Sequence, residues 1–92
     1  HAEEALSMGL VSRVVPSGTL DEEVRAVATE LAGKSPIGIR LGKEAFTQAE
    51  GMGLEESLKF LAAKIADVAS TDDAREGILA FVEKRRPEFK GR

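Results

Sequence analysis

The sequence has no cysteine, no tryptophan and no tyrosine, and its only histidine is His1. Without cysteine, the chain cannot form a disulfide, a thiolate nucleophile or a cysteine-based zinc site. A lone histidine also lacks the partners that a metal site or a histidine-based general base needs. We therefore expect no metal site, and the absence of disulfides is compatible with a reducing cytoplasm.

Long apolar runs and phosphate-loop motifs are missing as well. No apolar run approaches the roughly 18 residues that cross a bilayer, so we expect no membrane span. The "GMG" stretch at 51–53 lacks the further glycine and the lysine of a phosphate-binding loop. The acidic pairs at 3–4, 22–23, 55–56 and 72–73 fall in the first turns of predicted helices, where solvated acids favour the helix dipole. No catalytic residue can be assigned in this chain.

Charge is distributed unevenly along the chain. The net charge is −3, yet residues 84–92 hold five basic residues and one acidic residue, which leaves −7 on the remainder. An acidic body repels a polyanion, whereas a basic end attracts a small anion. We therefore expect no nucleic-acid partner.

The spacing of apolar residues, caps and glycines predicts a mostly α-helical chain. We expect about five helices and one short extended segment near the N-terminus, the β-branched stretch Leu10–Pro16. Gly9 is typical of a helix end, Ser35 of a helix start, and Pro87 should stop the last helix. Either Ser70 or Thr71 should cap that last helix.

Two features predict packing against something outside the chain's own core. The helix after "GMG" carries an apolar stripe too wide to cover within one small domain, formed by Leu54, Leu58, Leu61, Ile65 and Val68. Gly38 and Gly42, four residues apart in the preceding helix, indicate the close approach of another backbone or, as the alternative, of a ligand. We expect another domain or subunit to cover part of these surfaces.

Phe81 and Lys84 are the candidate binding residues. Their i, i+3 spacing places them on one helix face. An aromatic ring beside an ammonium group can hold a flat heterocycle that carries phosphate. The alternative is that Phe81 belongs to the core while Lys84 is solvated, and spacing alone favours this alternative.

Three blocks of the sequence resemble a known family. They are "AEEALSMGLVSRVVP", "SPIGIRLGKEAF" and "TDDAREGILAFVEKRRPEFKGR". In this order they resemble the C-terminal third of the enoyl-CoA hydratase/isomerase (crotonase) superfamily. The matching positions include Gly9, Val14, Val15, Pro16, Asp73, Glu76, Gly77, Ala80, Phe81, Lys84, Arg85, Pro87 and Phe89.

The resemblance implies a role for residues 1–92 as the helical oligomerisation and CoA-covering region of a crotonase-like protein. The N-terminal spiral core, which carries catalysis in the family, would be its partner, and family members assemble as trimers, often stacked into hexamers. In similar hydratases the residues that match Phe81 and Lys84 help to hold the adenine and phosphates of coenzyme A, often from a neighbouring subunit. The coenzyme A thioester would be the substrate, with no separate cofactor.

The implied parent reaction is syn addition of water to a 2-enoyl-CoA thioester through an enolate held in an oxyanion hole. No catalytic residue carries over to this chain, so we expect it to be inactive alone. Isomerisation or another crotonase-type acyl-CoA reaction is an alternative for the parent. A non-catalytic helical interaction module, or one subunit of a split enzyme, is an alternative from a different class. Arg86 stands where lysine is common in the family.

Overall fold

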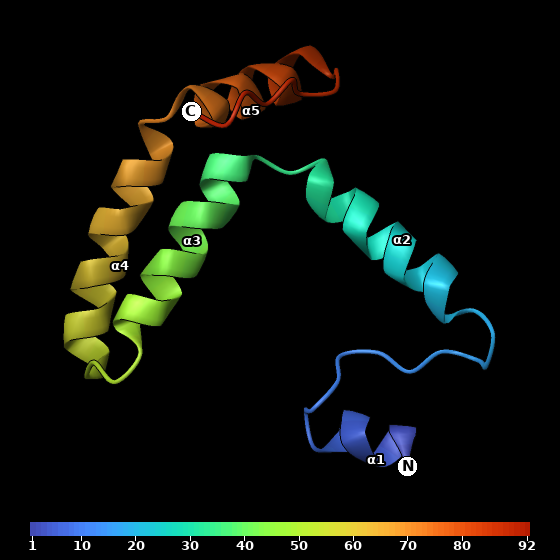
Figure 1. Ribbon diagram of the computed structural model, residues 1–92. Helices are drawn as coiled ribbons and strands as arrows, with labels where there is room; N and C mark the ends of the chain where they lie inside the picture. Colours follow the sequence, from blue (N-terminus) through green and yellow to red (C-terminus); the bar gives the residue numbers. More distant parts are fainter. The chain divides into compact units, whose positions relative to one another are not determined.

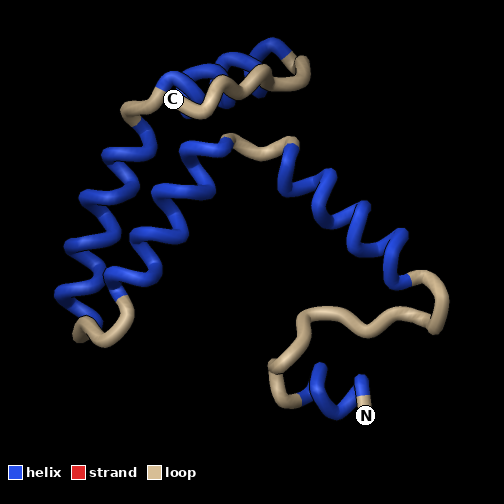
Figure 2. Tube along the Cα trace, in the orientation of Figure 1, coloured by secondary structure: helices blue, strands red, loops and turns tan.

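The computed structural model describes all 92 residues, which form five helices and no strand (Figure 1). The helices are α1 (Ala2–Ser7), α2 (Leu20–Ala32), α3 (Pro36–Ala49), α4 (Leu54–Ala69) and α5 (Asp72–Glu83). Figure 2 shows loop, not strand, between α1 and α2. The predicted helical fold with one extended segment is confirmed. The chain divides into two compact units, His1–Leu31 and Ala32–Arg92.

In the first unit, α1 is followed by the extended segment and then α2. Gly9 lies beyond the end of α1 with a left-handed φ of +74°. Its N–H donates to the Leu6 carbonyl at 3.1 Å, and the Leu10 N–H donates to the Ala5 carbonyl at 2.9 Å. This pair of bonds is the Schellman motif, in which glycine is the usual left-handed residue. The helix end predicted at Gly9 is therefore confirmed.

In the second unit, α3 and α4 run side by side in opposite directions (Figure 1). The Ser35 hydroxyl caps α3 by accepting from the Gly38 N–H at 3.1 Å, as the sequence predicts. The Thr71 hydroxyl caps α5 by accepting from the Ala74 N–H at 3.1 Å, which decides between the two predicted caps. Helix α5 lies across the end of the pair where α3 begins and α4 ends (Figure 1).

After α5 the chain turns back and follows that helix toward its start (Figure 1). We call residues 85–92 the tail. At its end, the Arg92 carbonyl accepts from the Asp73 N–H at 2.9 Å. The sequence predicted Pro87 as the helix stop, but α5 ends earlier, at Glu83. The reason is that Lys84 takes a left-handed conformation, which closes the helix before the proline is reached.

Few apolar side chains are buried within the chain. Ala45 and Ala80 are the only buried apolar residues. A groove of about 440 Å³ between α3 and α4 is lined mainly by apolar side chains and includes Gly38 and Gly42. A Cβ at Gly42 would meet no atom within 4 Å, and one at Gly38 would meet only Ser35. The backbone approach that these glycines predicted is therefore not made within the chain.

A helix that crosses a membrane must be both long and apolar. Of the five helices, not one combines the length and the apolar character that a bilayer crossing demands.

Candidate functional site

The candidate pair Phe81 and Lys84 lies where α5 meets the tail. Phe81 is in the last turn of α5 and is 82% exposed, so it is not a core residue of this chain. Lys84 is also exposed, and its ammonium group makes no ion pair or hydrogen bond. The helical i, i+3 argument is corrected by the structure, because Lys84 lies beyond the helix with φ 55° and ψ 38°.

Two backbone hydrogen bonds close the helix around Lys84. The Lys84 N–H donates to the Phe81 carbonyl at 3.3 Å, and the Arg85 N–H donates to the Ala80 carbonyl at 3.0 Å. This is again the Schellman pattern, now with a lysine at the position where glycine is usual. Lys84 is the only non-glycine residue of the chain with a positive φ. A residue with a Cβ is disfavoured in this region because the Cβ crowds the following carbonyl.

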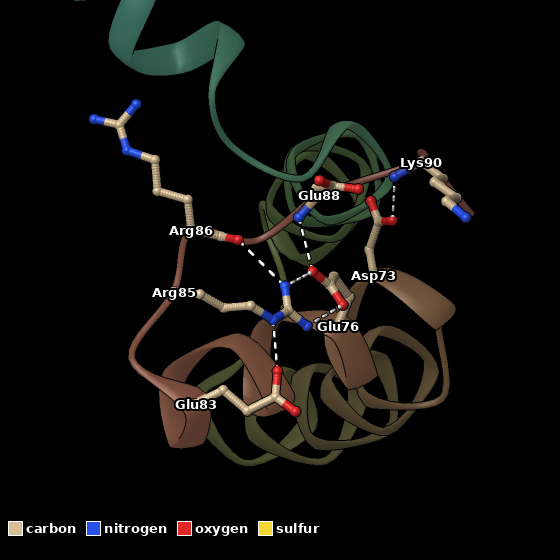
Figure 3. Close-up of polar contacts among 7 residues, drawn as sticks. All are labelled: Asp73, Glu76, Glu83, Arg85, Arg86, Glu88 and Lys90. Atoms are coloured by element: carbon tan, nitrogen blue, oxygen red, sulfur yellow. Dashed lines mark hydrogen bonds and ion pairs between the residues drawn. The ribbon is translucent and has the colours of Figure 1, made fainter.

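The side chain of Arg85 is bound by two carboxylates of α5 (Figure 3). Its Nη2 donates to Oε2 of Glu76 at 3.0 Å, and its Nη1 donates to Oε1 of the same carboxylate. Its Nε donates to Oε2 of Glu83. Such paired charge-assisted bonds fix the orientation of the guanidinium plane as well as its position. Arg85 is therefore held against the helix that it follows.

Glu76 joins α5 to the tail at a second point. Besides Arg85, its carboxylate accepts from the backbone N–H of Glu88 at 2.8 Å (Figure 3). The hydrogen bond from Arg85, followed by that from the Glu88 amide, lowers the pKa of Glu76 to about 2. The same carboxylates raise the pKa of Arg85 above its ordinary value. We call Glu76, Arg85 and the Glu88 amide the tail clamp.

Asp73 anchors the far end of the tail. It is 2% exposed, and it accepts from the Ser35 hydroxyl at 2.7 Å and from the Lys90 N–H at 2.7 Å. The Gly91 N–H donates to the same carboxylate at 3.0 Å. Burial alone would raise the pKa of Asp73, but the hydrogen bonds from Ser35 and from the tail amides outweigh it and lower the pKa. The tail is thus held to the start of α5 by a charged, fully hydrogen-bonded carboxylate.

The middle of the tail packs on a glycine of α5. A Cβ at Gly77 would lie 3.7 Å from a ring carbon of Phe89, so the missing side chain leaves room for the ring. The side chain of Arg86, by contrast, points away from the polar cluster, while its carbonyl accepts from Arg85 at 3.2 Å (Figure 3).

Of three consecutive basic residues, only Arg85 is therefore neutralised by carboxylates. The ammonium of Lys84 and the guanidinium of Arg86 make no ion pair. In the sequence, these two residues follow the exposed Phe81 by three and five positions. Unpaired cations that follow an exposed aromatic residue within a few positions suit an anionic ligand that also carries a flat ring. No group of three acidic or histidine side chains is placed to hold a metal ion.

Sequence reasoning missed Asp73, Glu76 and Arg85 as structural partners. It took the aspartate pair at 72–73 as solvated acids of a helix start, which is wrong for Asp73 because Ser35 and the tail enclose it. The available signal was the matching family block, in which all three residues appear. The Glu76–Arg85 pair spans 9 residues of the sequence and the Ser35–Asp73 pair spans 38, and no local pattern reveals pairs so far apart.

Comparison with known proteins now identifies the class to which this helical chain belongs. A family model described as enoyl-CoA hydratase/isomerase matches residues 1–92. A Thermus thermophilus protein named for enoyl-CoA hydratase activity is 46% identical over 89 residues, covering 97% of this chain and 35% of the relative. The 2,3-dehydroadipyl-CoA hydratase of Escherichia coli is 37% identical over 91 residues, covering 99% of this chain and 36% of the relative.

Solved structures agree with the sequence relatives. The enoyl-CoA hydratase of Bacillus anthracis matches with a TM-score of 0.90 at 38% identity, covering 99% of this chain and 35% of that one. The chain belongs to the enoyl-CoA hydratase/isomerase family, the crotonase superfamily. It spans about a third of the length of the relatives that it matches.

Proposed function

We propose that this chain is the C-terminal helical region of an enoyl-CoA hydratase-like enzyme, and that Phe81 and Lys84 form part of its coenzyme A site. The observation that carries the proposal is an 82% exposed Phe81 followed, after the end of α5, by the unpaired Lys84. Membership of a family of acyl-CoA enzymes supplies the ligand.

The chemistry of coenzyme A matches what the two side chains offer. Stacking of a base on an aromatic side chain is worth about 1–3 kcal/mol. An unpaired ammonium contributes a charge-assisted bond to a phosphate oxygen. Neither group is used inside the chain, so binding would break no existing contact. Arg86, which is also unpaired, could add a diffuse attraction for phosphate.

In this proposal, the longer protein carries out the reaction and the present chain supports it. The reaction is syn hydration of a 2-enoyl-CoA thioester through an enolate stabilised by an oxyanion hole outside these residues. Residues 1–92 would provide contacts for a trimer or hexamer and cover the acyl-CoA, with no catalytic residue and no cofactor of their own. A cytoplasmic location remains a prediction. The 92 residues alone should not hydrate crotonyl-CoA. Activity of the isolated chain would refute the proposal that catalysis lies outside these residues.

The binding role is tested by substitution in the longer protein. We expect Phe81→Ala and Lys84→Ala each to weaken coenzyme A binding about fivefold to fiftyfold, because each removes one direct contact. Isothermal titration with coenzyme A measures the dissociation constant. Val82→Ala and Lys43→Ala are matched controls that remove an exposed apolar side chain and an exposed lysine elsewhere, and they should leave it unchanged. Unchanged binding in both site variants would refute the assignment.

A second candidate is a non-catalytic helical module that binds a protein partner, or one subunit of a split enzyme. The apolar α3–α4 groove favours it, since Phe46 and Ile65 in its wall are more than two-thirds exposed. Sedimentation of the isolated chain tests both whether it self-associates and whether it binds a protein partner. Self-association, or binding of a separately expressed core, would support a split assembly. A stable monomer that binds neither a second copy nor the core would contradict it.

A further inference from the structure

The conformation of Lys84 is not one that lysine adopts by itself. Its φ of 55° lies in the left-handed region, which glycine enters freely and other residues enter at a cost. The Schellman bonds alone do not explain the choice of residue, because glycine would make the same two bonds. Something beyond these backbone bonds must hold the turn with a lysine in it.

The tail clamp supplies that support from both sides of the turn. Glu76 lies on α5, two turns before Lys84, and its carboxylate binds the side chain of Arg85, the next residue. The same carboxylate binds the N–H of Glu88, four residues after Lys84. One side chain therefore fixes the helix before the turn and the tail after it.

We propose that Glu76 is a positioning residue for coenzyme A binding, acting through Arg85 to hold Lys84 in its left-handed turn, directly after the last helical turn, which carries Phe81. The inference rests on the proposed role of Phe81 and Lys84. Glu76 does not touch the ligand in this scheme. With a side-chain exposure of 23%, it lies between α5 and the tail and not at the open face.

Simple electrostatics makes the opposite prediction, which gives the proposal a sharp test. Removing a carboxylate near an anion site raises the local positive potential and should strengthen phosphate binding. It would also free the two Nη groups of Arg85 from the Glu76 carboxylate, with only Glu83 still bound at Nε, so that they could bind phosphate themselves. If Glu76 acts by positioning, its loss weakens binding in spite of both effects.

The experiment uses Glu76→Gln in the longer protein, because glutamine keeps the shape and loses the charge. We expect the dissociation constant for coenzyme A and the KM for crotonyl-CoA to rise about threefold to tenfold, with kcat unchanged. Glu88→Gln is the matched control: it removes one negative charge from the tail but keeps the backbone N–H that Glu76 binds. It should not weaken binding. Arg85→Lys, which keeps the charge and loses the paired bonds, should act like Glu76→Gln.

A double-mutant cycle separates positioning from general destabilisation. If Glu76 acts through Lys84, the variant Glu76→Gln with Lys84→Ala should bind coenzyme A no worse than Lys84→Ala alone. The inference is overturned if the double variant loses affinity by the product of the two single losses. It is also overturned if Glu76→Gln binds coenzyme A as tightly as the parent or more tightly, or if it lowers kcat without raising KM. If Lys84→Ala itself has no effect, the proposed role of Lys84 in coenzyme A binding fails. If Lys84→Ala weakens binding and Glu76→Gln does not, only the inference fails.

Discussion

Helices α1 and α5 end with the same pair of backbone hydrogen bonds around one left-handed residue, but that residue is Gly9 in α1 and Lys84 in α5. At Gly9 the surroundings are empty, since a Cβ there would meet no atom within 4 Å. At Lys84 the following arginine is bound to Glu76 and Glu83. One helix end relies on the residue type alone, whereas the other is supported by its neighbours.

The difference shows where a strained backbone conformation occurs in this chain. A left-handed residue with a side chain persists only where the surrounding structure holds it, and such positions gather at functional sites. The supported turn in this chain lies at the proposed coenzyme A contact. The unsupported turn at Gly9 contains no candidate site residue.

The largest effect should come from the anchor that holds the tail beside the supported turn. Asp73→Ala removes the carboxylate that binds Ser35 and two tail amides, and it leaves those part-buried groups without that partner. We expect the tail to detach, so that trypsin cleaves it about tenfold faster or more. Mass spectrometry of the proposed longer protein after a timed digest measures the rate of cleavage at the bonds following Lys84, Arg85 and Lys90.

Asp72→Ala is the control for that prediction. Asp72 is the neighbouring acid in the same helix turn, it makes one exposed ion pair with Arg92 at 3.5 Å, and its loss changes the charge equally. Equal cleavage rates for the two variants would show that charge at the helix start, and not the anchor, protects the tail.

An intermediate effect is expected at the unsupported helix end. Gly9→Ala places a Cβ at φ +74°, which should lower the free energy of unfolding by about 1–2 kcal/mol. Thermal unfolding of the longer protein detects the change. Met8→Ala is the control in the same turn, where φ is −83°, and it should change the free energy of unfolding by less than about 0.5 kcal/mol. If Gly9→Ala is as stable as Met8→Ala, the contrast between the two helix ends loses its basis.

The sequence predicted the helices well because their signals are local. Gly9, Ser35 and Thr71 act on neighbours within a few residues, and each stands where a cap or a stop was expected. Pro87 misled the prediction because the left-handed turn at Lys84 ends α5 before it. Lys84 gives no sequence signal for that turn, because glycine is the residue that usually predicts it.

The polar network was beyond local pattern reasoning. The Ser35–Asp73 bond joins α5 to the start of α3, and the Glu76–Arg85 pair forms only after the chain reverses. Phe81 was identified from its spacing and from the family resemblance, but its exposure required the structure. Whether Phe81 and Lys84 bind coenzyme A remains a prediction.

The most direct test of the central claim is Lys84→Gly in the longer protein, with stability and coenzyme A affinity measured on the same sample. Glycine relieves the left-handed strain, so the free energy of unfolding should rise by about 0.5–1 kcal/mol. Loss of the ammonium should weaken coenzyme A binding about fivefold or more. The predicted result is therefore a rise in the free energy of unfolding together with a fall in coenzyme A affinity. A variant that is more stable and binds coenzyme A as tightly as the parent would contradict it.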